Sequence, residues 1–289
     1  VAAKLCLVSD ADLVVVSAAV PPPPVLASYM PAAEVAQVQQ FAAAWEINQE
    51  LAKRHCIEAV DRLELAGLKS RYQVLEGTPD IELAQFAQSE NIDVVVAGSR
   101  GQSRFMGSIL GSISRKLVNH LPCSVLIAKS PHDVDDDEAR TRMELKNQLS
   151  TILAYDGSEG SGKALQFLGR LSPMISSALV VSVSPMALFP PGLDPLVLTQ
   201  VIETDAERSV NAAKQGAQQL EAFGIATEHL ATTGRPAEAI VASAKENSAD
   251  LIVVGANTHG TLERLVLGSV AEEVTIQSEC SVLVVRPKG

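Results

Sequence analysis

Apolar residues follow two different periods along this chain, and the two periods alternate. Short unbroken apolar runs such as 94–97 and 251–254 are typical of strands that are buried on both faces. Longer segments such as 33–66 carry an apolar residue every three or four positions, which indicates a helix. This alternation of strands and helices predicts an α/β fold, in which helices cover both faces of a parallel sheet.

The predicted elements occur in the same order twice. In the first part we expect strands at 12–19, 71–75, 92–97 and 124–128, and helices at 33–66, 79–90 and 112–120. In the second part we expect strands at 151–155, 179–183, 227–231, 250–254 and 281–285, and helices at 160–172, 197–223, 236–247 and 269–278. Gly67 is expected to end the first long helix, and Thr78 to be the N-cap of the helix that begins at Pro79.

An internal repeat explains this order. The residue numbers differ by 157 in each of three pairs of like residues, Gly98 and Gly255, Gly111 and Gly268, and Cys123 and Cys280. A constant spacing between matched glycines and cysteines indicates a tandem duplication. We therefore predict a first domain at 1–130, an acidic linker at 131–149 and a second domain at 150–289.

The beginnings of the two halves align at another offset, with Lys4 over Arg170. At that offset, the counterpart of Asp156 and of the strand before it would lie ahead of Val1. We therefore expect the first half to lack its first strand in this chain.

Composition and charge exclude several classes of function. The net charge of −11 argues against nucleic-acid binding, and an aromatic content of 3% leaves few residues to stack on bases. No apolar run is long enough to span a membrane. The four cysteines form no paired or metal-binding pattern, and no signal peptide is visible, so we expect a cytoplasmic protein with reduced thiols. The acidic cluster at 133–138 is interpreted as a solvated linker.

The candidate chemistry lies where two of the apolar strands end. Gly98 and Gly255 follow these strands, and a second glycine then precedes a serine, at Gly111-Ser112 and at 268–269. A glycine-rich turn before a helix presents free backbone N–H groups and the positive end of the helix dipole. Such a turn favours the binding of a phosphate group.

The spacing Gly98-x2-Gly101-x9-Gly111-Ser112 resembles the ATP-binding signature of universal stress proteins. The blocks at 152–158, 234–236, 253–255, 267–272 and 280–286 in the second half resemble this family as well. The resemblance implies two flavodoxin-like domains, of the adenine nucleotide alpha hydrolase-like type, each with five parallel strands. ATP would lie across the carboxyl ends of those strands.

The resemblance also implies roles for individual residues. Asp156 would contact the adenosine part of ATP, and the backbone of Val183 would meet the adenine. The phosphates would be held by the glycine loops and helix starts, which comprise Gly255, Thr258, Gly260, Gly268 and Ser269 in the second half, and Gly98, Gly101, Gly111 and Ser112 in the first. Thr258 stands where the family pattern has its second glycine, with Gly260 nearby. We propose no metal site beyond a Mg or Mn ion that accompanies the nucleotide.

Two main functions remain open at this point. One is an ATP-binding regulatory module with little or no ATPase activity and a regulatory protein partner, since the sequence has no P-loop and no nucleophile elbow. The other is a scaffold that keeps the fold without binding nucleotide, because glycines can serve turn geometry and Asp156 can form an Asx turn. An enzyme of the wider adenine-nucleotide α/β group is a weaker third alternative.

The strands at 124–128 and 281–285 would each leave an apolar sheet edge. We therefore expect them to pair across the halves or between chains, which would give a pseudo-two-fold core and an intramolecular pseudo-dimer. We expect the chain to form a homodimer as well.

Overall fold

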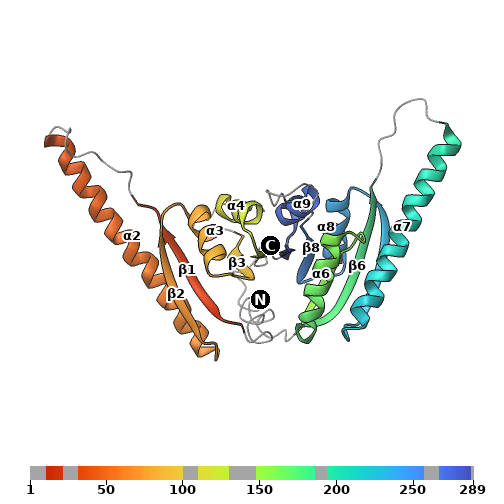
Figure 1. Ribbon diagram of the computed structural model, residues 1–289, viewed down its shortest axis with the longest axis horizontal. Helices are drawn as coiled ribbons and strands as arrows, with labels where there is room; N and C mark the ends of the chain where they lie inside the picture. Colours follow the sequence, from red (N-terminus) through yellow and green to blue (C-terminus); the bar gives the residue numbers. More distant parts are fainter. Residues whose placement is uncertain are drawn as a thin grey trace. The chain divides into compact units, whose positions relative to one another are not determined.

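The computed structural model describes residues 11–21, 32–99, 110–129, 148–185, 194–256 and 267–287 (Figure 1). The chain forms two compact units, Val1–Asn91 and Ile92–Gly289. The boundary between these units lies inside the first half of the sequence repeat, so the compact units and the repeats divide the chain differently.

The first unit contains two parallel strands and two helices. Strand β1 (Leu13–Ala19) pairs along its whole length with β2 (Ser70–Glu76), and helices α2 (Ala32–Leu65) and α3 (Pro79–Ser89) pack against them. As predicted, Gly67 ends α2: its φ is 78°, and Leu68 N donates a hydrogen bond to Leu63 O. Thr78 occupies the N-cap of α3, but its side chain makes no capping hydrogen bond.

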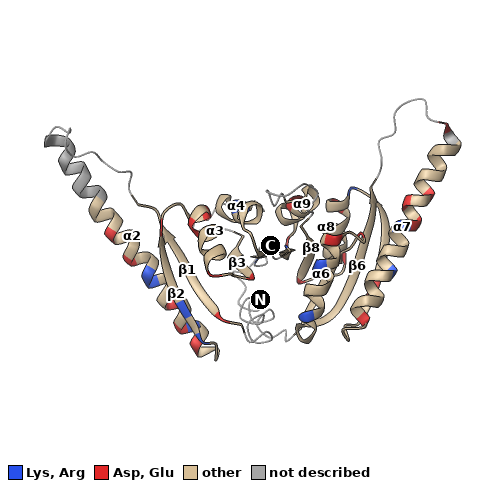
Figure 2. Cartoon of the chain, viewed as in Figure 1, with Lys and Arg blue, Asp and Glu red and all other residues tan. Residues whose placement is uncertain are grey.

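The second unit is built on a seven-stranded sheet. Its strands are β3 (Val94–Gly98), β4 (Ser124–Ala128), β5 (Leu149–Ala154), β6 (Ile175–Pro185), β7 (Thr227–Gly234), β8 (Leu251–Gly255) and β9 (Ser281–Val285). They are arranged in the order β3-β4-β9-β8-β5-β6-β7, and every neighbouring pair is parallel except β4 and β9. Glu228 is the one Asp, Glu, Lys or Arg in these seven strands. The red and blue segments are more frequent along helices such as α2 and α7 (Figure 2). The apolar composition of the strands suits a sheet that is covered by helices.

The helices of this unit are α4 (Ser112–His120), α6 (Glu159–Arg170), α7 (Pro195–Glu221), α8 (Pro236–Glu246) and α9 (Ser269–Gln277), with a 3-10 turn η2 (Ser172–Met174). Helix α7 packs against β6 and β7, and α6 packs against β8 and β9. The core lies between the helices and the sheet, where Ile152, Leu165, Val253 and Leu283 are at most 1% exposed.

The two halves of the repeat contribute differently to the sheets. In the second half, the order β7-β6-β5-β8-β9 places the first strand of that half, β5, in the middle. Among the described residues, the strands of the first half form two separate pairs, β1 with β2 and β3 with β4, and none takes the equivalent central place. The expected lack of a first strand stays a prediction, because residues 1–10 lie outside the described ranges.

The halves join where β4 runs antiparallel to β9. Leu126 lies opposite Leu283, and these two residues are equivalent in the repeat because their numbers differ by 157. On either side, Val125 lies opposite Val284 and Ile127 lies opposite Val282. A two-fold axis between equivalent strands requires this antiparallel pairing. The prediction that the two final strands pair across the halves is confirmed.

Candidate functional site

The carboxyl ends of β5, β6 and β8 meet at one edge of the seven-stranded sheet, because these strands are adjacent and parallel. Asp156 follows β5, Gly255 is the last residue of β8, and Val183 lies near the end of β6. The structure therefore brings three of the predicted site residues to the edge where α/β sheets bind ligands.

Asp156 is held by the turn that leads from β5 into α6. Its Oδ1 accepts hydrogen bonds from Ser158 N at 2.9 Å and from Ser161 Oγ at 2.7 Å. Ser158 is the N-cap of α6, since its Oγ accepts from Ser161 N. Among the described residues no hydrogen bond ends on Oδ2 of Asp156. Oδ1 of Asp156 thus stabilises the turn.

The charge of this carboxylate follows from the same contacts. Burial raises the pKa of Asp156, but the hydrogen bonds from Ser158 and Ser161 outweigh that effect, so its pKa lies below the usual 3.8. The side chain is therefore ionised at neutral pH.

Gly255 brings β8 directly against the start of α6. A Cβ at this position would lie 2.3 Å from the carbonyl C and O of Gly160, and 2.7 Å from Ser161 N. Only glycine fits at this distance, because a helix backbone cannot move away as a flexible side chain could. This glycine therefore has a packing role that the sequence did not reveal.

Strand β6 continues past the end of β5. The pairing of β5 with β6 ends at Ala154 and Val181, where Tyr155 N also donates to Val181 O, whereas β6 runs on to Pro185. Beyond this point β6 pairs with β7 through Val183 and Thr232. Among the described residues no strand pairs with the other side of β6 beyond Val181. Backbone groups at this end of β6 can therefore meet a ligand.

Two helix starts have the form that was predicted for phosphate binding. Gly268 is the N-cap of α9 and Gly111 is the N-cap of α4, and neither helix has a side-chain capping hydrogen bond. Ser269 and Ser112, the first residues of these helices, are exposed. Uncapped N–H groups in the first turn of a helix can bind an anion.

Three predicted site residues lie outside the described residues. Gly101 belongs to the segment 100–109, and Thr258 and Gly260 belong to 257–266. Their contribution stays a prediction. The acidic cluster at 133–138 also lies outside the described residues, and within the described ranges no group of three or more potential metal ligands occurs.

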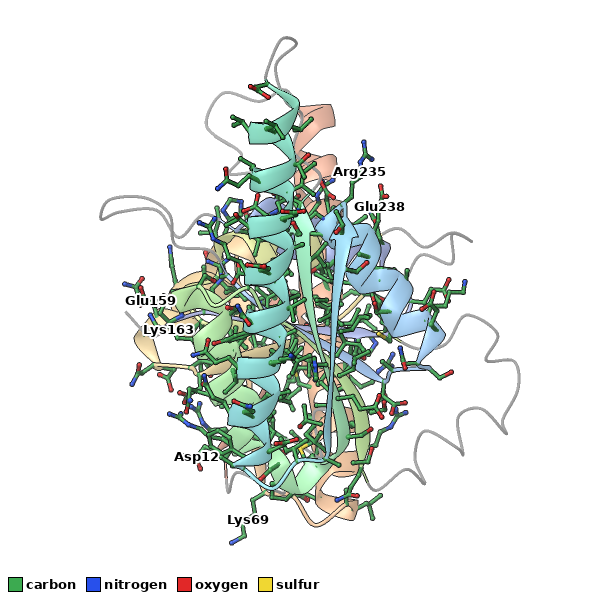
Figure 3. The ribbon with its side chains drawn as sticks, turned by 90° about the vertical axis from the view of Figure 1, so that its right-hand side faces the viewer. Asp12, Lys69, Glu159, Lys163, Arg235 and Glu238 are labelled. Carbon is green, nitrogen blue, oxygen red and sulfur yellow. The ribbon has the colours of Figure 1, made fainter. Side chains whose placement is uncertain are left out.

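The Asx turn that was considered for Asp156 is formed, since Ser158 N donates to its Oδ1. Sequence reasoning missed Ser161 as the second partner of Asp156. The pattern Asp156-Gly-Ser158-x-x-Ser161 was a usable signal, because an Asx turn followed by a serine N-cap is a common start of a helix. On the outer side of the same helix turn, Lys163 forms an ion pair with Glu159 (Figure 3).

Among the helices of the described ranges, none combines the length and the apolar content that a membrane crossing requires.

Comparison with known proteins matches both halves to one family. The model of the universal stress protein family matches residues 1–129 and 150–286. The Universal stress protein Slr1230 of Synechocystis is 26% identical over 243 residues, which cover 83% of this chain and 74% of that protein. A universal stress protein from Thermus aquaticus is 32% identical over 136 residues, or 47% of this chain and 96% of its own length.

Solved structures agree on the fold. The crystal structure of a universal stress protein from Archaeoglobus fulgidus superposes with a TM-score of 0.62 and 21% identity, covering 98% of this chain and 89% of the other. This likeness extends over both halves of the chain, so it supports two α/β domains of the same type in tandem.

Proposed function

The chain belongs to the universal stress protein family, and on this premise we propose that its second half binds an adenine nucleotide, with ATP as the expected ligand. The observation that carries this proposal is an ionised Asp156 at the carboxyl ends of β5, β6 and β8, in a half whose helix α9 has an uncapped start. A nucleotide has complementary groups, with ribose hydroxyls as donors, an adenine ring and an anionic phosphate chain.

In this proposal each group has a chemically suitable partner. Asp156 accepts hydrogen bonds from the ribose through Oδ2, since the described hydrogen bonds to this carboxylate end on Oδ1. The backbone near Val183 meets the adenine at the open side of β6. The first turn of α9, with Gly268 and the Ser269 hydroxyl, binds the phosphates. Gly255, Thr258 and Gly260 are the other residues of this half that we propose for phosphate binding, and a Mg or Mn ion accompanies the nucleotide.

The first half offers the phosphate part of such a site. Gly98 ends β3, and Gly111 N, directly before Ser112, donates to Ser99 O at 2.8 Å. The complete glycine spacing with Gly101 favours a phosphate here as well. We expect the second half to bind the adenosine part, because Asp156 belongs to that half.

We propose a regulatory role in the cytoplasm rather than catalysis. Fast phosphoryl transfer needs cations that clamp the phosphates and a base that is placed near the nucleophile, and the sequence contains no motif that supplies them. ATP turnover would then be slow or absent. Bound nucleotide would instead change the surface that a regulatory protein partner binds.

A scaffold without nucleotide is the second candidate, and two observations favour it. Gly255 is needed for packing against Gly160, and Asp156 stabilises the turn into α6. Both residues therefore have a reason to be present in a protein that binds no ligand.

The two candidates are distinguished by measuring nucleotide in the purified protein. Freshly purified protein is denatured and the released adenine nucleotide is quantified, and ATP affinity is measured by calorimetry. The matched variants are Asp156→Ala and Ser161→Ala, because both remove the 2.7 Å hydrogen bond and only the first removes the carboxylate. We expect Asp156→Ala to weaken ATP binding by about tenfold or more and Ser161→Ala to have little effect.

Each outcome of this measurement has one meaning. Equal losses in both variants would assign Asp156 a structural role alone. Loss with Gly111→Val but not with Asp156→Ala would move the site to the first half. Absence of nucleotide together with no binding of added ATP would leave the scaffold as the function.

A further inference from the structure

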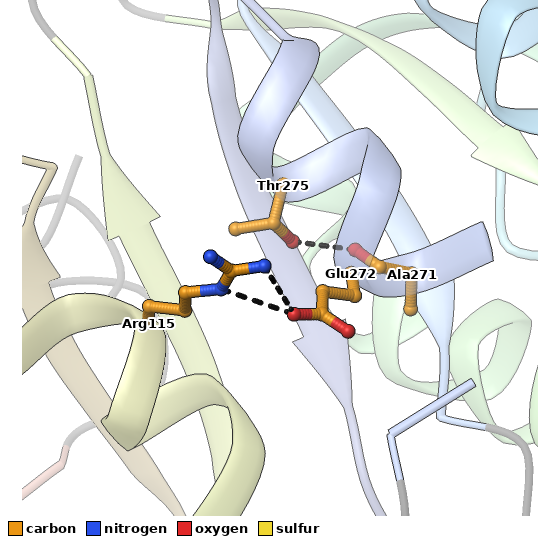
Figure 4. A network of polar contacts seen from close by, with 4 residues as sticks. All are labelled: Arg115, Ala271, Glu272 and Thr275. Atoms are coloured by element: carbon orange, nitrogen blue, oxygen red, sulfur yellow. Dashed lines mark hydrogen bonds and ion pairs between the residues drawn. The ribbon is translucent and has the colours of Figure 1, made fainter. Parts of the chain in front are cut away.

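An ion pair lies between equivalent positions of the two halves. Arg115 in α4 and Glu272 in α9 differ in number by 157, which is the spacing of the repeat. Arg115 donates from Nε and Nη2 to Glu272 Oε1 at 3.1 and 3.0 Å (Figure 4). Both side chains point toward the contact between the helices, beside the strand pair β4–β9. The pair therefore lies on the pseudo-two-fold axis.

Residues on such an axis meet their own equivalents. Leu126 and Leu283 do so in the sheet, and they are identical in type. Arg115 and Glu272 are also equivalent, but they carry opposite charges. If two copies of the second half paired through β9, Glu272 would face another Glu272. If two copies of the first half paired through β4, Arg115 would face another Arg115.

We propose that Arg115 and Glu272 select the partner at the β4–β9 interface. The second half presents a surface formed by β9 and α9. This surface fits a half that has a cation at the position of Arg115, and the first half of this chain is such a half. Pairing between two like halves is disfavoured by repulsion. The interface thereby joins unlike halves.

The strength of this selection follows from the exposure of the two side chains. Arg115 is 55% exposed and Glu272 is 33% exposed, so water and salt screen the pair and each contact has a modest effect. Selection depends on the difference in free energy between pairing of unlike halves and pairing of like halves. When like halves pair, an attraction is lost and a repulsion is added. Beside this ion pair, Thr275 Oγ1 donates to Ala271 O within α9 (Figure 4).

The test redistributes the same charges between two full-length chains. Arg115→Glu gives a chain with Glu at both axis positions, and Glu272→Arg gives a chain with Arg at both. Each variant repels itself within one chain, but the two attract each other at both interfaces. The matched control mixes the unaltered chain with the double reversal Arg115→Glu/Glu272→Arg, in which every contact between unlike halves of different chains is repulsive, whereas contacts between like halves are attractive in both mixtures and cancel.

The two mixtures are unfolded and refolded together with different affinity tags, and the 1:1 complex is quantified by sequential purification. We expect about tenfold more mixed complex from the single-reversal pair than from the control, and equal amounts in 1 M salt. Association through other surfaces contributes equally to both mixtures, so it cancels. Circular dichroism verifies that each chain is folded.

Equal yields at low salt would overturn the proposal. If a single reversal fails to refold, neutral variants are compared with the control mixture instead. Arg115→Gln and Glu272→Gln remove the charges and keep side chains of similar size. Two chains that each carry both neutral changes should form mixed complexes at a yield between those of the two charged mixtures. A yield at or below that of the control mixture would also contradict the proposal.

Discussion

Lys129 and Arg286 occupy equivalent positions after β4 and β9, and each donates hydrogen bonds to the end of a helix in the other half. Lys129 Nζ donates to Thr275 O and Ser278 O at the end of α9. Arg286 Nη2 donates to Val118 O and Asn119 O near the end of α4. The last carbonyl groups of a helix lack partners within the helix, and they carry the negative end of its dipole. Each half therefore completes a helix of the other half.

Replacing Arg286 should destabilise the protein more than replacing Lys129. Arg286 is 5% exposed, and its loss leaves buried carbonyl groups without that donor. We expect Arg286→Ala to lower the free energy of unfolding by about 1–3 kcal/mol, and Lys129→Ala by about 1 kcal/mol because Lys129 itself is only partly buried. Urea denaturation measures both changes, with Arg286→Lys as the variant that keeps a cation. A neutral Arg286→Ala would contradict this role.

Leu126 and Leu283 should behave as a coupled pair. They lie opposite each other at the centre of the join, and they are 0% and 1% exposed. Each change to Ala should cost about 2–5 kcal/mol, because it removes buried methyl groups and leaves a cavity. The double variant should cost less than the two single costs together, since the second change enlarges a cavity that already exists. Simple additivity in urea denaturation would indicate that the two side chains do not share one packing site.

Two glycines of one region should respond oppositely to alanine. Gly255→Ala places a Cβ against the backbone of Gly160, and it should destabilise the protein by about 1–3 kcal/mol. Gly162→Ala is the control, since it lies within α6 and a Cβ there meets no atom within 4 Å. It should stabilise the protein by about 0.5–1 kcal/mol through helix propensity. Thermal unfolding of the two variants tests both signs, and a tolerated Gly255→Ala would refute the close approach.

Asp156 should make stability depend on pH in the acidic range. Its pKa in the folded protein lies below the usual 3.8, so its ionised form favours folding. This contribution is fully present above the unfolded pKa, and it is lost as the pH falls through the lower folded pKa. We expect Asp156→Asn to be less stable than the unaltered protein at pH 6, with a smaller difference at pH 3. Urea denaturation at the two pH values measures this, and a difference that does not shrink would show that the charge has no role.

Much of the fold could be predicted because the strands are continuous apolar runs. The bounds predicted for α4, β4 and β9 match the structure, and most other ends differ by one or two residues. Strand β6 is an exception, since it begins at Ile175 rather than at 179. Its early residues Ser176 and Ser177 are exposed and polar, and the apolar pattern therefore begins after the strand does.

The site could be predicted only in part, because its contacts join residues that are distant in sequence. The place of Gly255 at the end of a strand predicts phosphate binding. Its second role, that only glycine fits beside Gly160, depends on how α6 packs against β8. The preference of Thr for N-caps placed Thr78 correctly, but propensity does not determine whether the hydroxyl forms its bond. The repeat located Arg115 and Glu272 at equivalent positions, yet only the antiparallel join brings them together.

The grouping of β3 and β4 with the second half has a consequence for how the chain opens. Amide hydrogens of β4 and β9 lie in one ladder, so they should exchange with solvent together and slowly. Strands β1 and β2 form a sheet of two strands, and such small sheets are intrinsically weak. Their amides should exchange first, in a local opening that spares the rest. The weakest cooperative boundary of this duplicated chain would then fall near residue 91, within a repeat rather than between repeats.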